Sequence, residues 1–214
     1  MNVDLLLHMG NDLFVANVAR VTLGKWHEEF MEMEDTRLIK YLARHNHWTP
    51  FAHPHVSFRC KAPIFVARQL QKHQVGFVWN EVSRRYVDVT PEFYMPEMRA
   101  RAEGVKQGSL DQVVEDNIGC MDKFENLVNA AHWTYNNLMA KGVAPEIARS
   151  VLPQSTMTEW IWTGSMYGFA RVCNLRLDKH AQKETRLITQ KLYDYLLRLF
   201  PVSMKELVNV HVDV

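Results

Sequence analysis

The sequence predicts an α+β fold in which a mostly antiparallel sheet is flanked by long helices. Residues 3–9, 55–62 and 156–164 have the apolar runs or the period-two alternation that is typical of strands. Segments with the 3.6-residue period of amphipathic helices lie between and after them, without the regular strand–helix alternation of a parallel sheet. Because the chain has 214 residues, 47% of them hydrophobic, we expect residues 1–214 to form a single domain.

The chain begins with a predicted strand and a predicted helix. Val3–Met9 is an apolar run that indicates the strand. A short helix is expected over Leu13–Val21. Asn11 or Asp12 can cap it, because either side chain can accept hydrogen bonds from free first-turn amides.

A second helix and a second strand follow. The helix begins near Glu34, and Pro50 ends it at the latest, since a proline disfavours helical backbone at the residue before it. In His55–Ala62, Val, Phe and Cys alternate with Ser, Arg and Lys, which indicates a half-buried strand. Pro63 suits the first turn of a helix over residues 63–73, because its missing amide hydrogen is not needed there.

The second half of the chain is predicted to be mostly helical. Thr90–Gly108 mixes prolines, charges and aromatic residues without a period, so we expect a loop. Apolar residues recur at helical spacing from Val114 onward and predict a long amphipathic helix that ends near Gly142. The same period over Ile188–Leu199 predicts a final helix, which Pro201 ends.

The charge balance argues against nucleic acid or a membrane surface as a partner. The chain has 25 basic and 24 acidic residues, and no basic stripe extends beyond Arg84 and Arg85. No apolar run reaches the roughly 18 residues needed to span a bilayer, and the first residues show no targeting pattern. We therefore expect a soluble, cytoplasmic protein whose ligand is a small anion.

Neither the cysteines nor the histidines have the spacing of a metal site. Cys60, Cys120 and Cys173 form no Cys-x-x-Cys pair, so we expect buried free thiols. His47 and His53 are six residues apart, whereas two ligands on one helix face are about three or four apart. The motifs of dinucleotide-binding, P-loop and serine-hydrolase sites are also absent from the sequence.

Charged and polar residues concentrate in RQLQKHQVGFVWNEVSRRY, the stretch from Arg68 to Tyr86. In an extended conformation its last residues would place Glu81, Ser83 and Arg85 on one face. A guanidinium and a hydroxyl suit a phosphate, and a nearby carboxylate suits sugar hydroxyls or holds an arginine in place. A solvated, charged strand is the alternative interpretation.

Two further arginines are candidates for anion binding. Arg176 ends an apolar stretch, and the alternative to a ligand is an ion pair with Asp178 or Glu184. Arg149 lies on a predicted short helix among apolar residues, where an ordinary surface arginine is the alternative. The residue types alone leave both questions open.

In its order of motifs the chain resembles the flavin-dependent thymidylate synthases, the ThyX-type family, over nearly its whole length. The matching segments are MGND, VARVT, TPFAH, KAPIFVARQ, NEVSRRY, EFYMP, GVAPEIARSVLP, WTGS and NLRLDKHAQ. The family signature begins with R-H-R and continues to N-E-x-S-x-R-Y, and Asn80 to Tyr86 match this second half. Lys72, His73 and Gln74 replace the R-H-R triplet, and one extra residue lies between His73 and Asn80.

The resemblance implies a ThyX-like fold and reductive methylation of dUMP at C5 to give dTMP. Methylenetetrahydrofolate would donate the carbon, and FAD reduced by NADPH would donate the hydride, in a homotetramer with active sites shared between subunits. No protein nucleophile is implied. The catalytic residue would be Arg176, whose charge favours ionisation at uracil N3 and so makes C5 more nucleophilic.

The resemblance also implies the binding residues. The positions for dUMP are Gln69, Lys72, Glu81, Val82, Ser83, Arg84, Arg85, Arg149 and Arg176. The positions for FAD are His47, Thr49, Lys72, His73, Gln74, Glu81, Ser165, Tyr167 and Arg171.

The departures from the family pattern fall on the flavin side. Lys72 keeps a point charge, and Gln74 keeps only neutral hydrogen bonds. The two guanidinium groups of the R-H-R triplet, which can each donate paired hydrogen bonds, are therefore replaced. Ser165 and Tyr167 stand where Asn and Arg are usual, and Arg171 replaces an Asn. Two alternatives therefore stay open: an enzyme of the same fold that makes a different C5-modified pyrimidine nucleotide, and a dUMP-binding module with impaired flavin use.

Overall fold

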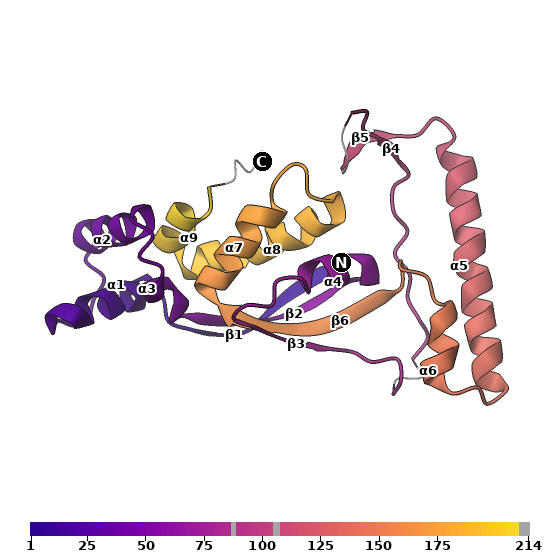
Figure 1. The fold of residues 1–214 in the computed structure, drawn as a ribbon, viewed down its shortest axis with the longest axis horizontal. Helices are drawn as coiled ribbons and strands as arrows, with labels where there is room; N and C mark the ends of the chain where they lie inside the picture. The colour runs from indigo at the N-terminus through magenta and orange to yellow at the C-terminus, as the bar shows by residue number, and fades with distance from the viewer. Residues whose placement is uncertain (87–88, 105–107, 210–214) are drawn as a thin grey trace.

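The structure is a computed structural model that describes residues 1–86, 89–104 and 108–209 (Figure 1). Four strands form an antiparallel sheet in the order β1-β2-β6-β3. They are β1 (Asn2–Met9), β2 (His55–Pro63), β6 (Met157–Ser165) and β3 (Phe77–Glu81). The predicted α+β class with an antiparallel sheet is confirmed.

Helices cover one face of this sheet (Figure 1). Val56, Phe58 and Cys60 of β2 are buried on that face, as their alternation predicts. The ring of Phe58 packs edge-on against Phe169, with 5.2 Å between the ring centroids. On the opposite face Ile161 of β6 stays 45% exposed, so this side of the sheet is open in the single chain. The covering helices are α4 (Ile64–Leu70), α7 (Met166–Arg176) and α8 (Lys183–Leu199), and α9 (Pro201–Leu207) packs against α8.

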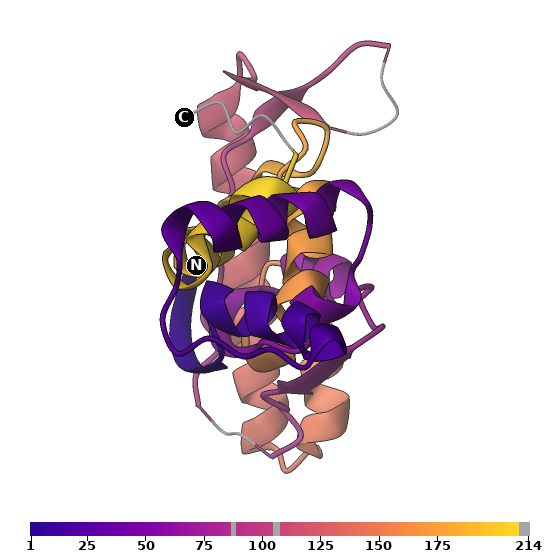
Figure 2. The ribbon, with the colours of Figure 1, turned by 90° about the vertical axis from the view of Figure 1, so that its left-hand side faces the viewer.

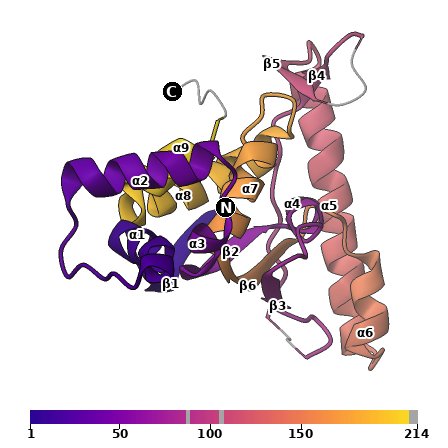
Figure 3. The same ribbon diagram turned by 60° about the vertical axis from the view of Figure 1, so that its left-hand side comes forward.

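The N-terminal helices gather at one end of the sheet, where α1 and α2 lie side by side (Figures 2 and 3). Asn11, one of the two predicted caps, caps α1, because its side chain accepts a hydrogen bond from the amide of Phe14 at 3.0 Å. The buried carboxylate of Asp12 accepts from the amide of Val202 at 2.7 Å and thereby joins α1 to α9. The elements at this end are α1 (Asp12–Arg20), η1 (Val21–Leu23), α2 (Glu32–Arg44) and α3 (Thr49–Ala52).

The segment between β3 and β6 extends beyond the other end of the sheet (Figure 1). The predicted long helix is confirmed as α5 (Asn117–Ala140). Its buried residues are Val128 and Tyr135, whereas Ile118, which belongs to the predicted apolar stripe, is 77% exposed. The elements here are β4 (Arg99–Arg101), β5 (Ser109–Val113), α5 (Asn117–Ala140), α6 (Pro145–Ala148) and η2 (Arg149–Val151). None of the described helices combines the length and the apolar character needed to cross a membrane.

Three predicted boundaries need correction. Pro63 pairs with Met157 as the last residue of β2, and it precedes α4 as its cap instead of lying in the first helical turn. The predicted loop over Thr90–Gly108 contains β4, which pairs with β5. Pro201 follows the end of α8, but it also starts α9, because a proline fits the first turn of a helix.

Candidate functional site

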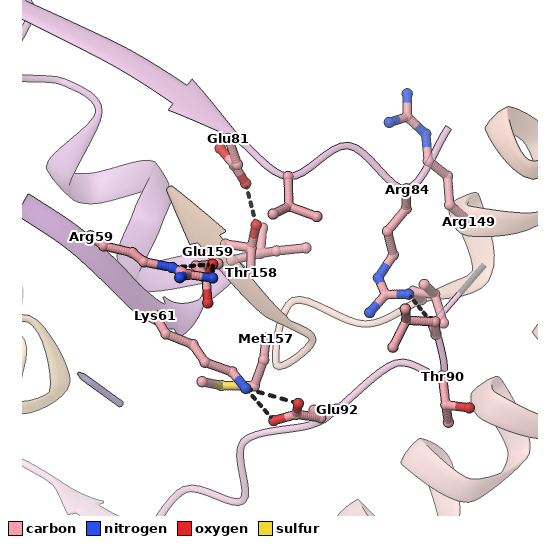
Figure 4. A pocket seen from close by; sticks show the side chains of 14 residues that line it. Arg59, Lys61, Glu81, Arg84, Thr90, Glu92, Arg149, Met157, Thr158 and Glu159 are labelled. Atoms are coloured by element: carbon pink, nitrogen blue, oxygen red, sulfur yellow. Dashed lines mark hydrogen bonds and ion pairs between the residues drawn. The ribbon is translucent and has the colours of Figure 1, made fainter. Parts of the chain in front are cut away.

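A cavity of about 500 Å³ lies where β2, the end of β3, the start of β6 and η2 meet (Figure 4). Figure 4 shows Glu81 on one side of this cavity and the side chains of Arg84 and Arg149 on the other. Val82 also lines it. Four of the residues predicted to bind dUMP therefore surround one cavity.

The carboxylate of Glu81 is held in a fixed orientation. The hydroxyl of Thr158 donates to Oε1 at 2.7 Å, and the indole N–H of Trp79 donates to Oε2 at 3.1 Å. The indole itself is stacked on Trp160, with ring centroids 4.5 Å apart and planes 15° apart. Since each carboxylate oxygen can accept more than one hydrogen bond, both can still accept from a ligand.

The basic side chains around this cavity differ in whether an acidic side chain already pairs with them. Arg59 donates to Glu159 at 2.7 Å, and Lys61 contacts Glu92 at 2.7 Å (Figure 4). Arg149 is exposed and has no ion-pair partner among the described residues. Its guanidinium is therefore available to an anionic ligand.

Ser83 and Arg85 do not share a face with Glu81, so that prediction is wrong. The strand β3 ends at Glu81, and the amide of Tyr86 donates to the carbonyl of Ser83 at 3.0 Å, which closes a turn. Within the turn, Nε of Arg85 donates to the Ser83 hydroxyl at 3.3 Å. The backbone is not extended through Arg85, so the side chains after Glu81 do not alternate between two faces as they would in a strand.

A second cavity, of about 510 Å³, contains Arg176 at the end of α7. It is lined by Gln69, Arg99, Asn174, Arg176, Asp178 and Gln182, among other residues. The two cavities share none of their lining residues. A single chain therefore does not bring Arg149 and Arg176 to the same cavity.

Arg176 does not form the ion pair that its neighbours in sequence suggested. Its Nε donates to Nε2 of His73 at 3.0 Å, and its Nη2 donates to the carbonyl of Gln69 at 3.2 Å. Glu184 instead accepts from Arg99 at 2.6 Å, and both side chains of that pair are buried. The alternative of a pair between Arg176 and Asp178 or Glu184 is wrong, because partners far away in sequence hold the guanidinium.

His73 is a neutral ring in this arrangement. Burial, followed by the charges of Arg176 and Arg171, lowers its pKa from 6.5 to about 4. Burial also lowers the pKa of Arg176. Nε2 of His73 is thus an unprotonated acceptor for Arg176, and the ring proton lies on Nδ1.

The side chain of Gln69 makes two hydrogen bonds within the protein. Its amide nitrogen donates to the side-chain oxygen of Gln182 at 2.6 Å, and its own oxygen accepts from the hydroxyl of Thr185 at 2.9 Å. These bonds join the end of α4 to the start of α8. Gln69 therefore shapes the wall of the Arg176 cavity, and one N–H of its amide has no partner among the described residues.

Three of the positions expected to bind FAD lie on α7 or cap it: Ser165, Tyr167 and Arg171. Ser165 caps this helix by accepting from the amide of Gly168 at 3.1 Å. The ring of Tyr167 lies 6.0 Å from that of Trp48, which precedes α3. The ring of Phe77, the first residue of β3, packs against Gly164 of β6, and its centroid lies 4.9 Å from that of Phe169 on α7, so the start of β3 is held beside this helix.

The remaining predicted flavin residues are mostly at the surface. The ring of His47 lies 5.9 Å from that of Tyr41, and Thr49 is the first residue of α3. Three further side chains that can interact with an anion or a polar ring are exposed: Lys72, Gln74 and Arg171. Arg171 lies one helical turn after Tyr167 on α7, and a cationic donor beside a partly buried aromatic side chain fits a phosphorylated, aromatic ligand.

Three residues that support these sites are not evident from the sequence. Trp79 and Thr158 orient Glu81, and Arg99 lines the Arg176 cavity while pairing with Glu184. Trp79 lies two residues before Glu81, so strand periodicity was the one available signal for it. The contacts of Thr158 and Arg99 join residues that are far apart in the chain.

The family model described as "Thymidylate synthase complementing protein" matches residues 4–202. A protein of Thermotoga neapolitana with the name flavin-dependent thymidylate synthase is 38% identical over 182 residues, which are 85% of this chain and 79% of that protein. The protein of the same name from Wolbachia pipientis is 34% identical over 206 residues, which are 94% of this chain and 72% of that protein.

Solved structures are similar over the same extent. The crystal structure of a UMP/dUMP methylase PolB from Streptomyces cacaoi bound with 5-Br dUMP has a TM-score of 0.86 and 29% identity, and the match covers 96% of this chain and 93% of that chain. The structure of PolB bound with 5-Br UMP has a TM-score of 0.86 and 28% identity, with 96% and 92% covered.

Proposed function

Because this chain belongs to the flavin-dependent thymidylate synthase family, we propose that it methylates dUMP at C5 to give dTMP. The observation that carries the proposal is the Arg176 cavity, where a partly buried guanidinium is held along one edge by two neutral acceptors. A cation in this setting stabilises negative charge that develops on a bound ring.

The uracil ring of dUMP would lie against Arg176. A positive charge beside the ring favours loss of the N3 proton and delocalises the resulting charge onto the ring oxygens. This raises electron density at C5, which then attacks the one-carbon unit. Arg176 therefore supplies the activation that another thymidylate synthase would obtain from a covalent thiolate.

The cysteines support a reaction without a protein nucleophile. Cys60 and Cys173 are buried, and burial raises the pKa of both thiols far above the usual range, so neither forms the reactive thiolate. Cys120 lies on α5, and no residue of α5 lines either cavity.

The phosphate and sugar of dUMP would be bound by residues of the first cavity. Arg149 and Arg84 are suited to a phosphate, and the oriented carboxylate of Glu81 is suited to a sugar hydroxyl or a ring N–H. Arg176 lines the other cavity, which shares no lining residue with this one within a single chain. We therefore place the active site between chains of a homotetramer.

Exposed apolar surface supports this assembly. On α5, Ile118 is 77% exposed, Leu127 61% and Trp133 68%, and Ile161 on the open face of the sheet is 45% exposed. Apolar surface of this kind is commonly covered by a second chain.

FAD would be held at the N-terminal half of α7. Lys72 and Arg171 would meet its phosphates, and Trp48 and Tyr167 offer aromatic surfaces to its rings. When bound, FAD supplies the hydride that completes the methyl group, with NADPH as the source of electrons and methylenetetrahydrofolate as the source of carbon. Lys72 contributes a point charge where the family has a forked arginine, so we expect weaker flavin binding than in relatives with the R-H-R triplet.

The experiment is a reaction of purified protein with dUMP, methylenetetrahydrofolate, FAD and NADPH, followed by mass analysis of the nucleotide. We expect the nucleotide product to have the mass of dTMP. The protein should show the absorption spectrum of bound flavin. A product heavier by one oxygen would favour the alternative of a different C5 modification. Binding of dUMP without flavin reduction or product would favour the binding module.

UMP is a reasonable second substrate to test, because the structurally similar PolB is described as a UMP/dUMP methylase. Parallel reactions with UMP and dUMP, analysed for methylated product, would determine which sugar this chain accepts.

A further inference from the structure

The guanidinium of Arg176 has two edges with different roles. A guanidinium carries five N–H donors. The Nε donor and one Nη2 donor bond to His73 and to the Gln69 carbonyl, which occupies the side edge. The end of the guanidinium, formed by Nη1 and the second Nη2 hydrogen, has no acceptor among the described residues, and Arg176 lines the cavity.

Both acceptors of the side edge come from one turn of chain at the end of α4. The amide of His73 donates to the carbonyl of Leu70 at 3.0 Å, and the amide of Gln71 donates to the carbonyl of Ala67 at 2.8 Å. Hydrogen bonds of the Gln69 side chain to Gln182 and Thr185 tie the same turn to α8. The turn is therefore a rigid support for the arginine.

We propose that His73 is a positioning residue for Arg176: its neutral ring accepts from Nε and directs the free end of the guanidinium at the pyrimidine. This inference rests on the proposed function. It assigns to His73 a role in the activation of uracil, separate from any contact with the flavin.

The proposal requires that His73 stays unprotonated. The charged groups that face it are Arg176 and Arg171, both on α7, and the Gln69 carbonyl of α4 accepts from the same guanidinium. A protonated ring would repel both arginines and would lose the acceptor at Nε2. A cationic or non-accepting side chain at position 73 should thus release the side edge of Arg176.

The test compares His73→Phe, which keeps a ring of similar size without an acceptor, with His73→Gln, whose amide oxygen can accept in place of Nε2. His8→Ala is the matched control, because His8 is an exposed histidine of β1. Two quantities are measured in each variant: kcat with its KM for dUMP, and ionisation at N3 of bound 5-fluoro-dUMP, followed by ultraviolet difference absorption.

We expect His73→Phe to lower kcat by about 10-fold to 100-fold, the effect of losing one hydrogen bond to a charged group, with KM changed by less than about 3-fold. The ionised fraction of bound 5-fluoro-dUMP should fall in the same variant. His73→Gln should recover at least half of the lost log kcat, and His8→Ala should match the parent protein.

The outcomes separate this inference from the proposed function. A His73→Phe protein with the kcat and the N3 ionisation of the parent would overturn the positioning role while leaving the proposed function intact. The positioning role would also be overturned if His73→Gln lost as much kcat as His73→Phe while both variants kept the melting temperature of the parent. If His73→Phe does not fold, the Gln variant decides, since it must keep the N3 ionisation of the parent. A parent protein that neither binds dUMP nor turns it over would instead overturn the proposed function.

Discussion

Replacement of Arg99 by Met should destabilise the protein strongly, because it leaves a buried carboxylate without its partner. The side chain of Arg99 is 9% exposed and that of Glu184 is 2% exposed, and the two atoms of the ion pair are 2.6 Å apart. Removal of one member of such a pair typically costs about 3–5 kcal/mol. Oε2 of Glu184 already lacks a partner in the described structure, so we expect about 4 kcal/mol, near the middle of this range.

The control is the double variant Arg99→Met with Glu184→Gln. It removes the uncompensated charge, so its free energy of unfolding should lie at least about 1 kcal/mol above that of the single variant. The measurement is urea unfolding of all variants at one protein concentration, because association of chains would couple stability to concentration. Two results would refute this account of the pair. One is a loss of unfolding free energy below about 1 kcal/mol in Arg99→Met, and the other is a loss in the double variant equal to the sum of the losses in the two single variants.

Three further predictions concern the sites. Arg149→Ala should weaken dUMP binding by about 10-fold to 100-fold, because a charged contact to phosphate is lost; calorimetry measures this, and unchanged affinity would place the phosphate elsewhere. Cys60→Ala combined with Cys173→Ala should keep kcat within about 3-fold of the parent in steady-state assays, since neither thiol forms a thiolate, whereas loss of turnover in a folded variant would indicate a role for sulfur. Because folding lowers the pKa of His73 from 6.5 to about 4, its contribution to stability is complete above pH 6.5 and declines as the pH falls toward about 4. The variant His73→Gln should show a flatter dependence of the free energy of unfolding on pH. An unchanged slope in chemical unfolding at several pH values would contradict a neutral, partly buried ring.

The elements with a strong period were the ones that the sequence predicted well. In β2 the alternation of Val56, Phe58 and Cys60 reflects which face is buried, and the structure has that pattern. The hairpin of β4 and β5 had no comparable signal. Its strands are short, β5 is exposed throughout, and Arg99 is held by Glu184 from a distant helix, so tertiary contacts determine its conformation.

The site was predictable as a set of residue types, but not as a set of contacts. The sequence indicated Arg176 and Arg149 as anion-binding candidates, yet the partners of Arg176 lie more than a hundred residues earlier in the chain, at His73 and Gln69. Nearest neighbours in sequence suggested Asp178 or Glu184 instead. Sequence spacing reports only local geometry, and this guanidinium is oriented by hydrogen bonds to the end of α4, which packs against α8.

The stack of Trp79 on Trp160 gives the first cavity an optical reporter. The indole N–H of Trp79 donates to the same carboxylate that would meet a ligand, and its ring lies parallel to a second, fully buried indole. When a ligand draws the Glu81 carboxylate toward itself, the polarity around that N–H changes and the emission of the indole pair changes with it. Tryptophan fluorescence can therefore follow nucleotide binding in the unlabelled protein, on the time scale of a stopped-flow mixing experiment.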